Sequence, residues 1–272
     1  MLNLTGKVNG NKLNIEQLNV FKSITYYDDT HTYYNNDTEL FTSVTSVIKK
    51  YQHDFNEEYW AKYKVLQNQG LQLKTDKSNN VPKGFYLLDS QLVHYKDLNV
   101  DINTMVESWK AGSDTSKTKG TKYHKYLENA WNNKYDTHDR IEVLDNIIKV
   151  LSSQYIPIKL EWVVADFDSR IAGQLDGFFY DTINSKYVIL DYKTDKEIKY
   201  FNRFQTFMPP LEFLSDCNYN KYTLQLNMYK HCIEKYLDIT IGSMIIVWIK
   251  PDGFELINIP ESQDLVKMIL SK

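Results

Sequence analysis

An apolar run at residues 187–190 ends in a charged pair, Asp191 and Lys193. Such a run predicts a strand buried on both faces, and the two-residue period of a strand places the Asp carboxylate beside the Lys ammonium. A charged pair at the end of a buried strand is costly unless it has a further partner, such as a metal ion. Asp176, in the sequence Gly173-Gln174-Leu175-Asp176-Gly177, puts a second carboxylate on the preceding strand. Two carboxylates from neighbouring strands form an oxygen-rich site that suits Mg²⁺ or Mn²⁺, and the lysine adds a positive charge beside it.

Two predicted helices carry polar residues at matching intervals. Gly120, His124 and Glu128 follow one another at four-residue spacing, so they share one helix face. His124 can therefore add an imidazole nitrogen as a third metal ligand. Gln225 and Tyr229 are also four residues apart, and an amide and a phenol there could hold a phosphate or orient a carboxylate.

Each of these residues also has a plain structural interpretation. His124 alone would be an ordinary polar helix residue, and Asp191 with Lys193 could be a strand-end salt bridge. Gln225 and Tyr229 could be helix-surface polarity. Glu161 alternates with Leu160 and Trp162 on a predicted strand, so both a solvent-facing role and a role as third carboxylate stay open.

The elements that must position these residues follow from the periodicity of the apolar residues. From residue 120 onward the pattern predicts two helices, three strands, one helix and two strands, at residues 121–132, 141–154, 158–164, 171–180, 187–193, 219–236, 244–249 and 254–259. Upstream, it predicts a hairpin over residues 23–41 and a helix capped by Thr42 or Ser43. Further helices are expected over residues 57–67 and 101–110, followed by a flexible segment at residues 111–120.

The composition describes a globular protein of 272 residues with 32 basic and 35 acidic side chains and a formal net charge of −3. A chain of this length buries a core without the help of disulfides or metals. It has no apolar run of 18 residues, and its start lacks the apolar centre of a signal peptide, so we expect a cytoplasmic protein without a membrane partner. The mild acidity is weak evidence against nucleic-acid binding, but a carboxylate-rich metal site is itself negative until its cation binds.

The two cysteines narrow the choice of cofactor. Cys217 and Cys232 lie 15 residues apart, without the spacing of a thiolate cluster. A four-thiolate zinc site or iron–sulfur cluster within one chain is therefore excluded. A zinc peptidase is also disfavoured, because the sequence has no His-Glu-x-x-His motif.

Taken together and in order, these motifs resemble the RecB-type branch of the PD-(D/E)XK nuclease superfamily. The branch shows Gly-Thr-x-x-His on a helix, a Glu on the next strand, Gly-x-x-Asp, Asp-Tyr-Lys-Thr and Gln-x-x-x-Tyr. The matching positions are Gly120, Thr121, His124, Glu161, Gly173, Asp176, Asp191, Tyr192, Lys193, Thr194, Gln225 and Tyr229. The resemblance covers residues 118–250, and residues 31–48 are similar to the amino-terminal segment of phage-encoded exonucleases of this branch.

The resemblance implies an α/β (α+β) fold with a restriction-endonuclease-like core. In that core a central mixed sheet is flanked by helices. It further implies a nuclease core at residues 118–260, a mostly helical N-terminal extension with a hairpin at residues 1–117, and a C-terminal helix or tail at residues 261–272. The implied activity is Mg²⁺- or Mn²⁺-dependent hydrolysis of DNA, as an exonuclease on linear DNA in phage recombination or DNA processing.

The resemblance also assigns roles to individual residues. His124, Asp176, Asp191 and the Tyr192 carbonyl are the implied metal ligands, and Lys193 positions the nucleophile or stabilises developing charge. Glu161 is a further candidate acid. Supporting or phosphate-binding roles fall to Gly120, Thr121, Thr194, Gln225 and Tyr229.

Two alternatives to an exonuclease stay open at this point. A site-specific or structure-specific endonuclease shares the same Asp and Asp-x-Lys core, and a non-catalytic nucleic-acid-binding protein could keep the fold. Besides DNA, a single-strand annealing protein or a helicase is a candidate partner, because the chain has no nucleotide-binding Gly-Lys-Thr motif of its own. A homo-oligomer is also open. If the protein is phage-encoded, its location is the cytoplasm of the host cell.

Overall fold

A computed structural model describes residue 13 and residues 16–68, 85–88, 91–94, 99–134 and 139–271. The chain forms two compact units. The first contains Met1–His53 and Gly120–Lys272, and the second contains Asp54–Lys119. All the residues that the sequence singles out for chemistry belong to the first unit.

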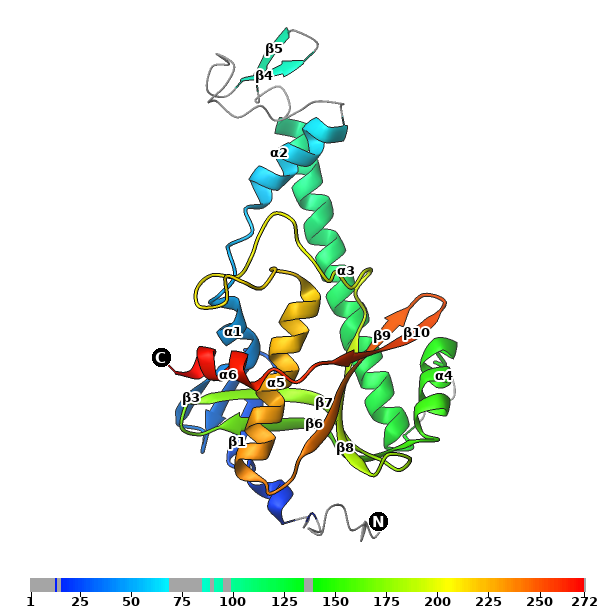
Figure 1. The fold of residues 1–272 in the computed structure, drawn as a ribbon. Helices are drawn as coiled ribbons and strands as arrows, with labels where there is room; N and C mark the ends of the chain where they lie inside the picture. The colour runs from blue at the N-terminus through cyan, green and yellow to red at the C-terminus, as the bar shows by residue number, and fades with distance from the viewer. Residues whose placement is uncertain are drawn as a thin grey trace. The chain divides into compact units, whose positions relative to one another are not determined.

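An eight-stranded sheet forms the centre of the first unit (Figure 1). Its strands are β1 (Ile24–Tyr27), β2 (Thr32–Asn35), β3 (Glu39–Ser43), β6 (Tyr155–Asp166), β7 (Ile171–Asp181), β8 (Lys186–Lys193), β9 (Ile241–Lys250) and β10 (Gly253–Ile259). The order is β1-β2-β3-β7-β8-β9-β10, with β6 paired to β7. The pairs β3–β7 and β8–β9 are parallel and the others are antiparallel, which confirms the expected central mixed sheet.

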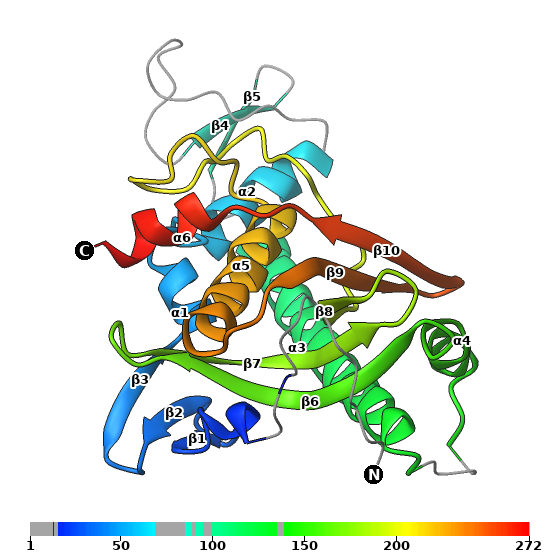
Figure 2. The same ribbon diagram turned by 60° about the horizontal axis from the view of Figure 1, so that its bottom comes forward.

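Helices cover both faces of this sheet (Figure 2). On one face the core includes residues of α1 (Val44–Lys49), α5 (Asn218–Tyr236) and α6 (Gln263–Leu270). On the other face it includes the last turns of α3 (Asn99–Trp131) together with α4 (Glu142–Leu151). The strand period explains this division, because Val188 and Leu190 pack with α4 whereas Ile189 packs with α5. The predicted order of elements from residue 120 onward is confirmed.

The N-terminal residues, expected to form a mostly helical extension with a hairpin, contribute three strands to the sheet. The hairpin predicted over residues 23–41 forms β1 and β2, and β3 pairs in parallel with β7 at Thr42 and Ser43. Ser43 is the N-cap of α1, as expected, because its side chain accepts a hydrogen bond from the Ser46 backbone NH. Phe41 and Val44 are fully buried, so this segment is part of the same core as the strands that follow.

The predicted flexible segment at residues 111–120 is wrong, because α3 runs without a break from Asn99 to Trp131. Three hydroxyl side chains in this stretch donate back to the carbonyl four residues earlier: Thr115 to Ala111, Ser116 to Gly112 and Thr118 to Asp114. Such bonds keep small polar residues compatible with a helix, which composition alone does not reveal.

The second unit contains α2 (Glu57–Asn68), the hairpin β4 (Phe85–Leu88) and β5 (Gln91–His94), and the first part of α3. Helix α2 is the helix predicted over residues 57–67. Its Ala61, Val65 and Leu66 pack with Ile102 of α3 into a small separate core. Within the described part of the chain, no helix combines the length and the apolar composition that crossing a membrane requires.

Candidate active site

Three carboxylates lie in a row across three neighbouring strands. Gly177 of β7 pairs with the residue before Glu161 on β6 and with the residue before Asp191 on β8. One step along the ladder, Asp176 therefore faces Glu161 on one side and Asp191 on the other. The sheet register thus gathers acids that are 15 residues apart in the sequence into one polar cluster.

Glu161 enters this cluster because the backbone of β6 departs from a regular pleat there. Its φ of 46° lies in the left-handed region, which is uncommon for a residue other than glycine. The Gln174 amide donates to the Glu161 carbonyl at 3.1 Å and holds this turn of the backbone. Burial, together with the nearby Asp176 charge, raises the pKa of Glu161 to about 8. Glu161 is therefore a member of the acidic cluster and not a solvent-facing residue.

His124 connects the helix α3 to the strands β7 and β8. Its Nδ1 lies 3.1 Å from Asp176 Oδ1, and its Nε2 lies 3.1 Å from the Tyr192 carbonyl oxygen. Burial lowers the pKa of His124, but the Asp176 charge and hydrogen bond outweigh it and bring the pKa to about 9. The ring is therefore an imidazolium at neutral pH and donates to both oxygens.

Asp176 is the centre of this arrangement. Its second oxygen accepts a 2.6 Å hydrogen bond from the Tyr192 backbone NH. Burial by itself would raise the pKa of Asp176, but the charge of His124 dominates and the pKa falls below its usual range. Asp176 therefore keeps its negative charge and joins the middle of β7 to the end of β8 and to α3.

Asp191 and Lys193 lie beside each other, as the strand period predicts. The Lys193 Nζ is 2.6 Å from Asp191 Oδ2 and also lies 4.8 Å from the centre of the Tyr222 ring. The contact between Lys193 and Asp191 is an ion pair without good hydrogen-bond geometry. Asp191 Oδ2 is buried and has no hydrogen-bond partner within the described residues. Burial raises the pKa of Asp191 to about 6. A buried carboxylate oxygen in this condition is a candidate ligand for a cation.

The side chains present fit a divalent cation. His124, Glu161 and Asp176 each offer one ligand atom, and these three atoms lie within 4.8 Å of one another. Asp191 adds the buried oxygen described above, and the Tyr192 carbonyl adds a neutral one. Carboxylate and carbonyl oxygens with one imidazole nitrogen are a donor set that Mg²⁺ and Mn²⁺ accept. In this structure the protonated His124 ring supplies the positive charge between the Asp176 carboxylate and the Tyr192 carbonyl.

Gln225 and Tyr229 contact β7 and not the carboxylates. Gln225 Nε2 donates to Tyr229 Oη at 2.9 Å, and Tyr229 Oη donates to the Gln174 carbonyl at 3.0 Å. A side chain at Gly173 would place its Cβ 2.5 Å from Tyr229 Cε1, so the glycine permits this close approach of α5 to the strand. Since Gln174 in turn supports Glu161, the pair positions the acidic cluster through the backbone.

The remaining predicted positions lie at the start of the His124 segment and the end of β8. A Cβ at Gly120 would lie 3.6 Å from Thr194 Oγ1, so these two residues are neighbours. Thr121 is exposed and Thr194 is half-buried.

Asp195 is a residue of this region that the sequence interpretation missed. Its carboxylate accepts hydrogen bonds from Tyr222 Oη at 2.7 Å and from Asn218 Nδ2 at 3.3 Å. Its carbonyl accepts from Trp248 Nε1 at 2.8 Å. A signal was available, because Asp195 lies two residues after Lys193 and Tyr222 is one helical turn before Gln225. Asp195 fixes Tyr222, whose ring lies beside the Lys193 ammonium.

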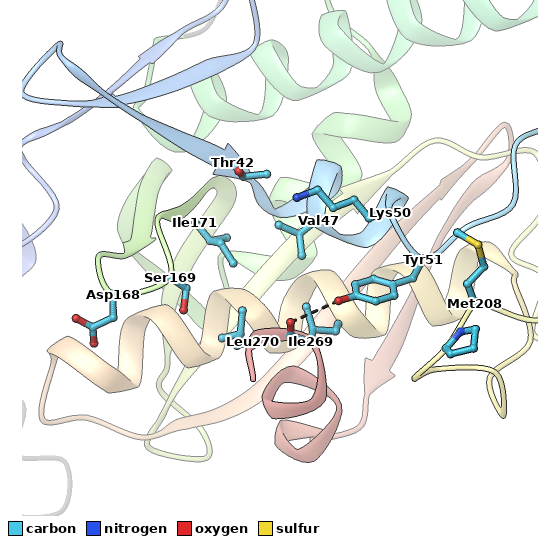
Figure 3. A pocket seen from close by; sticks show the side chains of 11 residues that line it. Thr42, Val47, Lys50, Tyr51, Asp168, Ser169, Ile171, Met208, Ile269 and Leu270 are labelled. Carbon is cyan, nitrogen blue, oxygen red and sulfur yellow. Dashed lines mark hydrogen bonds between the residues drawn. The ribbon is translucent and has the colours of Figure 1, made fainter. Parts of the chain in front are cut away.

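A groove of about 760 Å³ lies elsewhere in the first unit (Figure 3). It is lined by residues of α1, the turn between β6 and β7, the loop before α5, and α6. Tyr51 Oη donates to the Ile269 carbonyl there. None of the predicted site residues lines this groove, and Asp168 is the acid in it, paired with Lys235 at 2.7 Å. The concave space and the acidic cluster are therefore separate features.

Comparisons with known proteins add little to this description. No family model matches the chain, and no curated protein is similar to it in sequence. A solved structure titled "Crystal structure of SSO0001" aligns with 46% of this chain at 16% identity and a TM-score of 0.26. The aligned part spans 50% of that structure's own length. At this score the similarity supports no conclusion on fold or function.

Proposed function

We propose that this protein is a metal-dependent DNA nuclease that hydrolyses phosphodiester bonds, acting as an exonuclease on linear DNA in phage recombination or DNA processing. The observation that carries the proposal is the convergence of Glu161 and Asp176 on His124, with the Asp191–Lys193 pair on the adjacent strand β8. The order of the motifs along the chain, which resembles RecB-type nucleases, supports DNA as the substrate and a restriction-endonuclease-like core as the fold.

The proposed metal ligands are His124, Asp176, Asp191 and the Tyr192 carbonyl. A bound Mg²⁺ or Mn²⁺ would lower the pKa of a water molecule and offset the negative charge of a phosphate. His124 must lose a proton before it can act as a ligand, and its release from Asp176 frees that carboxylate as well.

The other side chains of the cluster have distinct chemical roles in this proposal. Glu161, with its pKa near 8, can hold or release a proton at its carboxylate near neutral pH, which suits a general base. Lys193 is kept in its charged form, because the attraction of Asp191 and Asp176 exceeds the opposing effect of burial on its pKa. Its ammonium is therefore available to stabilise the negative charge that develops on a phosphoryl oxygen.

Digestion of end-labelled linear duplex and of covalently closed circular duplex tests the proposal. With Mg²⁺ or Mn²⁺ we expect the linear DNA to be degraded and the circle to resist, and with EDTA neither should change. Asp191→Ala, purified in the same way, excludes a contaminating nuclease. Cleavage of circles at the same rate would favour the endonuclease alternative. Intact linear DNA in both metals, with binding retained, would favour a non-catalytic nucleic-acid-binding protein.

A further inference from the structure

The loop between β8 and α5 exposes several aromatic rings. Tyr200, Phe201, Phe204 and Phe213 are 56%, 71%, 55% and 61% exposed, respectively. Twelve large hydrophobic side chains are exposed among the described residues. Residues 200–213 of this loop therefore hold a third of them. The loop, drawn in yellow in Figure 1, leads from the end of β8 to the start of α5. Exposed aromatic side chains that gather in one loop make that loop a candidate binding surface.

The loop is held in a defined conformation. Asn202 accounts for two of its bonds, since its NH donates to Ser215 Oγ at 2.5 Å and its Nδ2 donates to the Asp216 carbonyl at 2.8 Å. The Phe207 NH donates to the Leu214 carbonyl at 2.9 Å, and the Phe207 side chain is fully buried. The loop therefore turns one phenylalanine into the core while it holds others in water. Rigid aromatic side chains lose little conformational entropy when they bind a partner.

Basic side chains lie among the first three of these rings. Lys196, Lys199 and Arg203 lie at residues 196–204 together with Glu197, whereas the other acids of the loop, Asp195, Glu212 and Asp216, lie toward its two ends. Arg203 Cζ lies 4.5 Å from the centre of the Phe204 ring, so a guanidinium and an aromatic ring already stack on each other. Aromatic rings mixed with basic side chains are the pattern that binds single-stranded nucleic acid.

The loop is tied to the candidate active site. Asn218 Nδ2 donates to both the Asp195 carboxylate and the Glu197 carbonyl, and the Lys199 NH donates to Asn218 Oδ1 at 2.7 Å. Phe201 is six residues from Asp195, so it lies within about 20 Å of that residue.

We propose that Phe201, Phe204 and Phe213, together with Arg203, form a stacking surface for the unpaired bases of a DNA strand that leads to the active site. This inference rests on the proposed nuclease function and names its substrate class as single-stranded DNA or a duplex with a single-stranded overhang. In a blunt duplex the base faces are already stacked on one another, whereas an unpaired strand offers them to the exposed rings. Arg203 and the neighbouring lysines contact the phosphates of the same strand.

Binding measurements in EDTA test this surface without cleavage of the probe. The probes are a fluorescein-labelled 20-nucleotide strand, an abasic strand of equal length and charge, and a blunt 20-base-pair duplex. The full chain should bind the normal strand more tightly than the other two. Phe201→Ala combined with Phe204→Ala should raise the Kd for the normal strand by about 5- to 150-fold and leave the Kd for the abasic strand unchanged.

Two further variants separate stacking from general apolar contact. Phe204→Leu keeps the apolar volume without the flat ring, so it should behave like Phe204→Ala. Ile183→Ala removes a side chain that is 70% exposed in the turn after β7, so its binding should match the unchanged protein. Circular dichroism and thermal unfolding should be the same for all variants, because the altered side chains are exposed.

The outcomes separate this inference from the proposed function. Equal affinity for normal and abasic strands, or unchanged binding by the double variant, overturns the stacking surface even if the protein hydrolyses DNA. Base-dependent binding that the double variant loses supports it even if no metal produces hydrolysis. A double variant that changes from dimer to monomer in light scattering, with unaltered DNA binding, overturns it and assigns the rings to a second copy of the chain.

Discussion

His124 has two oxygen acceptors in the structure, one in the middle of β7 and one near the end of the neighbouring strand β8. The Asp176 carboxylate and the Tyr192 carbonyl are each 3.1 Å from a ring nitrogen. Such a histidine acts as a positive charge that a divalent cation could replace. The distinction between a packing residue and a metal ligand therefore depends on whether metal competes for the same oxygens.

His124→Ala tests this competition. The variant should need at least about tenfold more Mn²⁺ for half-maximal nuclease activity, with partial recovery at high Mn²⁺, because one neutral ligand is lost. Asp191→Ala should not recover in the same titration, since it removes a charged ligand. His53→Ala changes an exposed histidine outside the site and is the control. An unchanged Mn²⁺ requirement in His124→Ala would leave His124 as a packing residue.

Asp191 and Lys193 should each be essential for turnover. We expect Asp191→Ala and Lys193→Ala to lower kcat by about 100- to 1,000-fold, because each removes a charge from a water-poor site. The circular dichroism spectra should stay unchanged, since both residues lie at the end of β8 and not in its apolar centre. Lys186→Ala, at the opposite end of the same strand, is the matched control and should keep full activity. Turnover near the unaltered level in either variant would dismiss the proposed site.

At the scale of elements, the site depends on how closely α5 approaches β7. The Tyr229 ring is fully buried against Gly173, and its hydroxyl donates to the β7 backbone. Helix and strand therefore meet through a glycine, and no methyl group fits between them without a shift. This contact supports Gln174, whose side chain in turn donates to the backbone carbonyl of Glu161, where φ is positive.

Gly173→Ala should therefore destabilise the fold. The added Cβ would lie 2.5 Å from Tyr229 Cε1 and 3.2 Å from Val44 Cγ2, so we expect a loss of about 1–3 kcal/mol in urea unfolding. Gly120→Ala is the control within the same unit. There the new Cβ meets Thr194 Oγ1 at an ordinary 3.6 Å, and alanine favours a helix, so stability should be kept or should rise by up to about 1 kcal/mol. Equal midpoints for Gly173→Ala and the unaltered chain would mean that Tyr229 relaxes freely.

The sequence predicted the elements better than their irregularities. Periodicity is a local property, so it found the strand ending at Lys193 and the helix carrying Gln225. It could not find the irregular backbone at Glu161, because a positive φ at a non-glycine residue is imposed by tertiary contacts. It also placed a break before residue 121, where hydroxyl side chains such as Thr118 in fact bond along the helix.

At the scale of the whole molecule, pairing between distant segments decides which residues meet. The parallel pairing of Thr42 and Ser43 with β7 joins segments more than 120 residues apart, and no local pattern announces it. The same is true of the contacts of Gln225 and Tyr229, which helical spacing placed on one face but could not assign to β7. The row of three acids was easier to anticipate, because consecutive antiparallel strands bring equally spaced residues into register.

The stability of the whole fold should depend on another buried acid, which has no part in the proposed catalysis. Asp166, at the end of β6, is almost completely buried and joins the β6–β7 turn to α5. It accepts hydrogen bonds from Lys235 Nζ at 2.5 Å, Tyr236 Oη at 2.9 Å and Ser169 Oγ at 2.8 Å. Burial opposes ionisation here, but the hydrogen bonds from His231, Lys235, Ser169 and Tyr236 outweigh it and hold the pKa of Asp166 well below its usual range.

The sign of the resulting pH dependence follows from linkage. Because the pKa of Asp166 is lower in the folded state, its ionised form stabilises the protein at pH values above the ordinary carboxyl pKa near 4. That contribution is lost as the pH falls below about 4 toward the lower pKa of the folded state. At pH 7, Asp166→Asn should therefore be about 2–4 kcal/mol less stable than the unaltered chain. Between pH 5 and pH 3, the unfolding free energy of this variant should fall by less than that of the unaltered chain.

Asp168→Asn provides the matched control for this last prediction. The Asp168 carboxylate binds the same Lys235 ammonium at 2.7 Å, but its side chain is 79% exposed and water screens the pair. Its removal should change the free energy of unfolding by less than about 1 kcal/mol at each pH. Urea unfolding at pH 7, 5 and 3 measures all three proteins. If both variants lose the same amount of unfolding free energy, burial does not decide the strength of these ion pairs. If Asp166→Asn keeps the full acid sensitivity of the unaltered chain, the acid lability must come from the carboxylates of the candidate site.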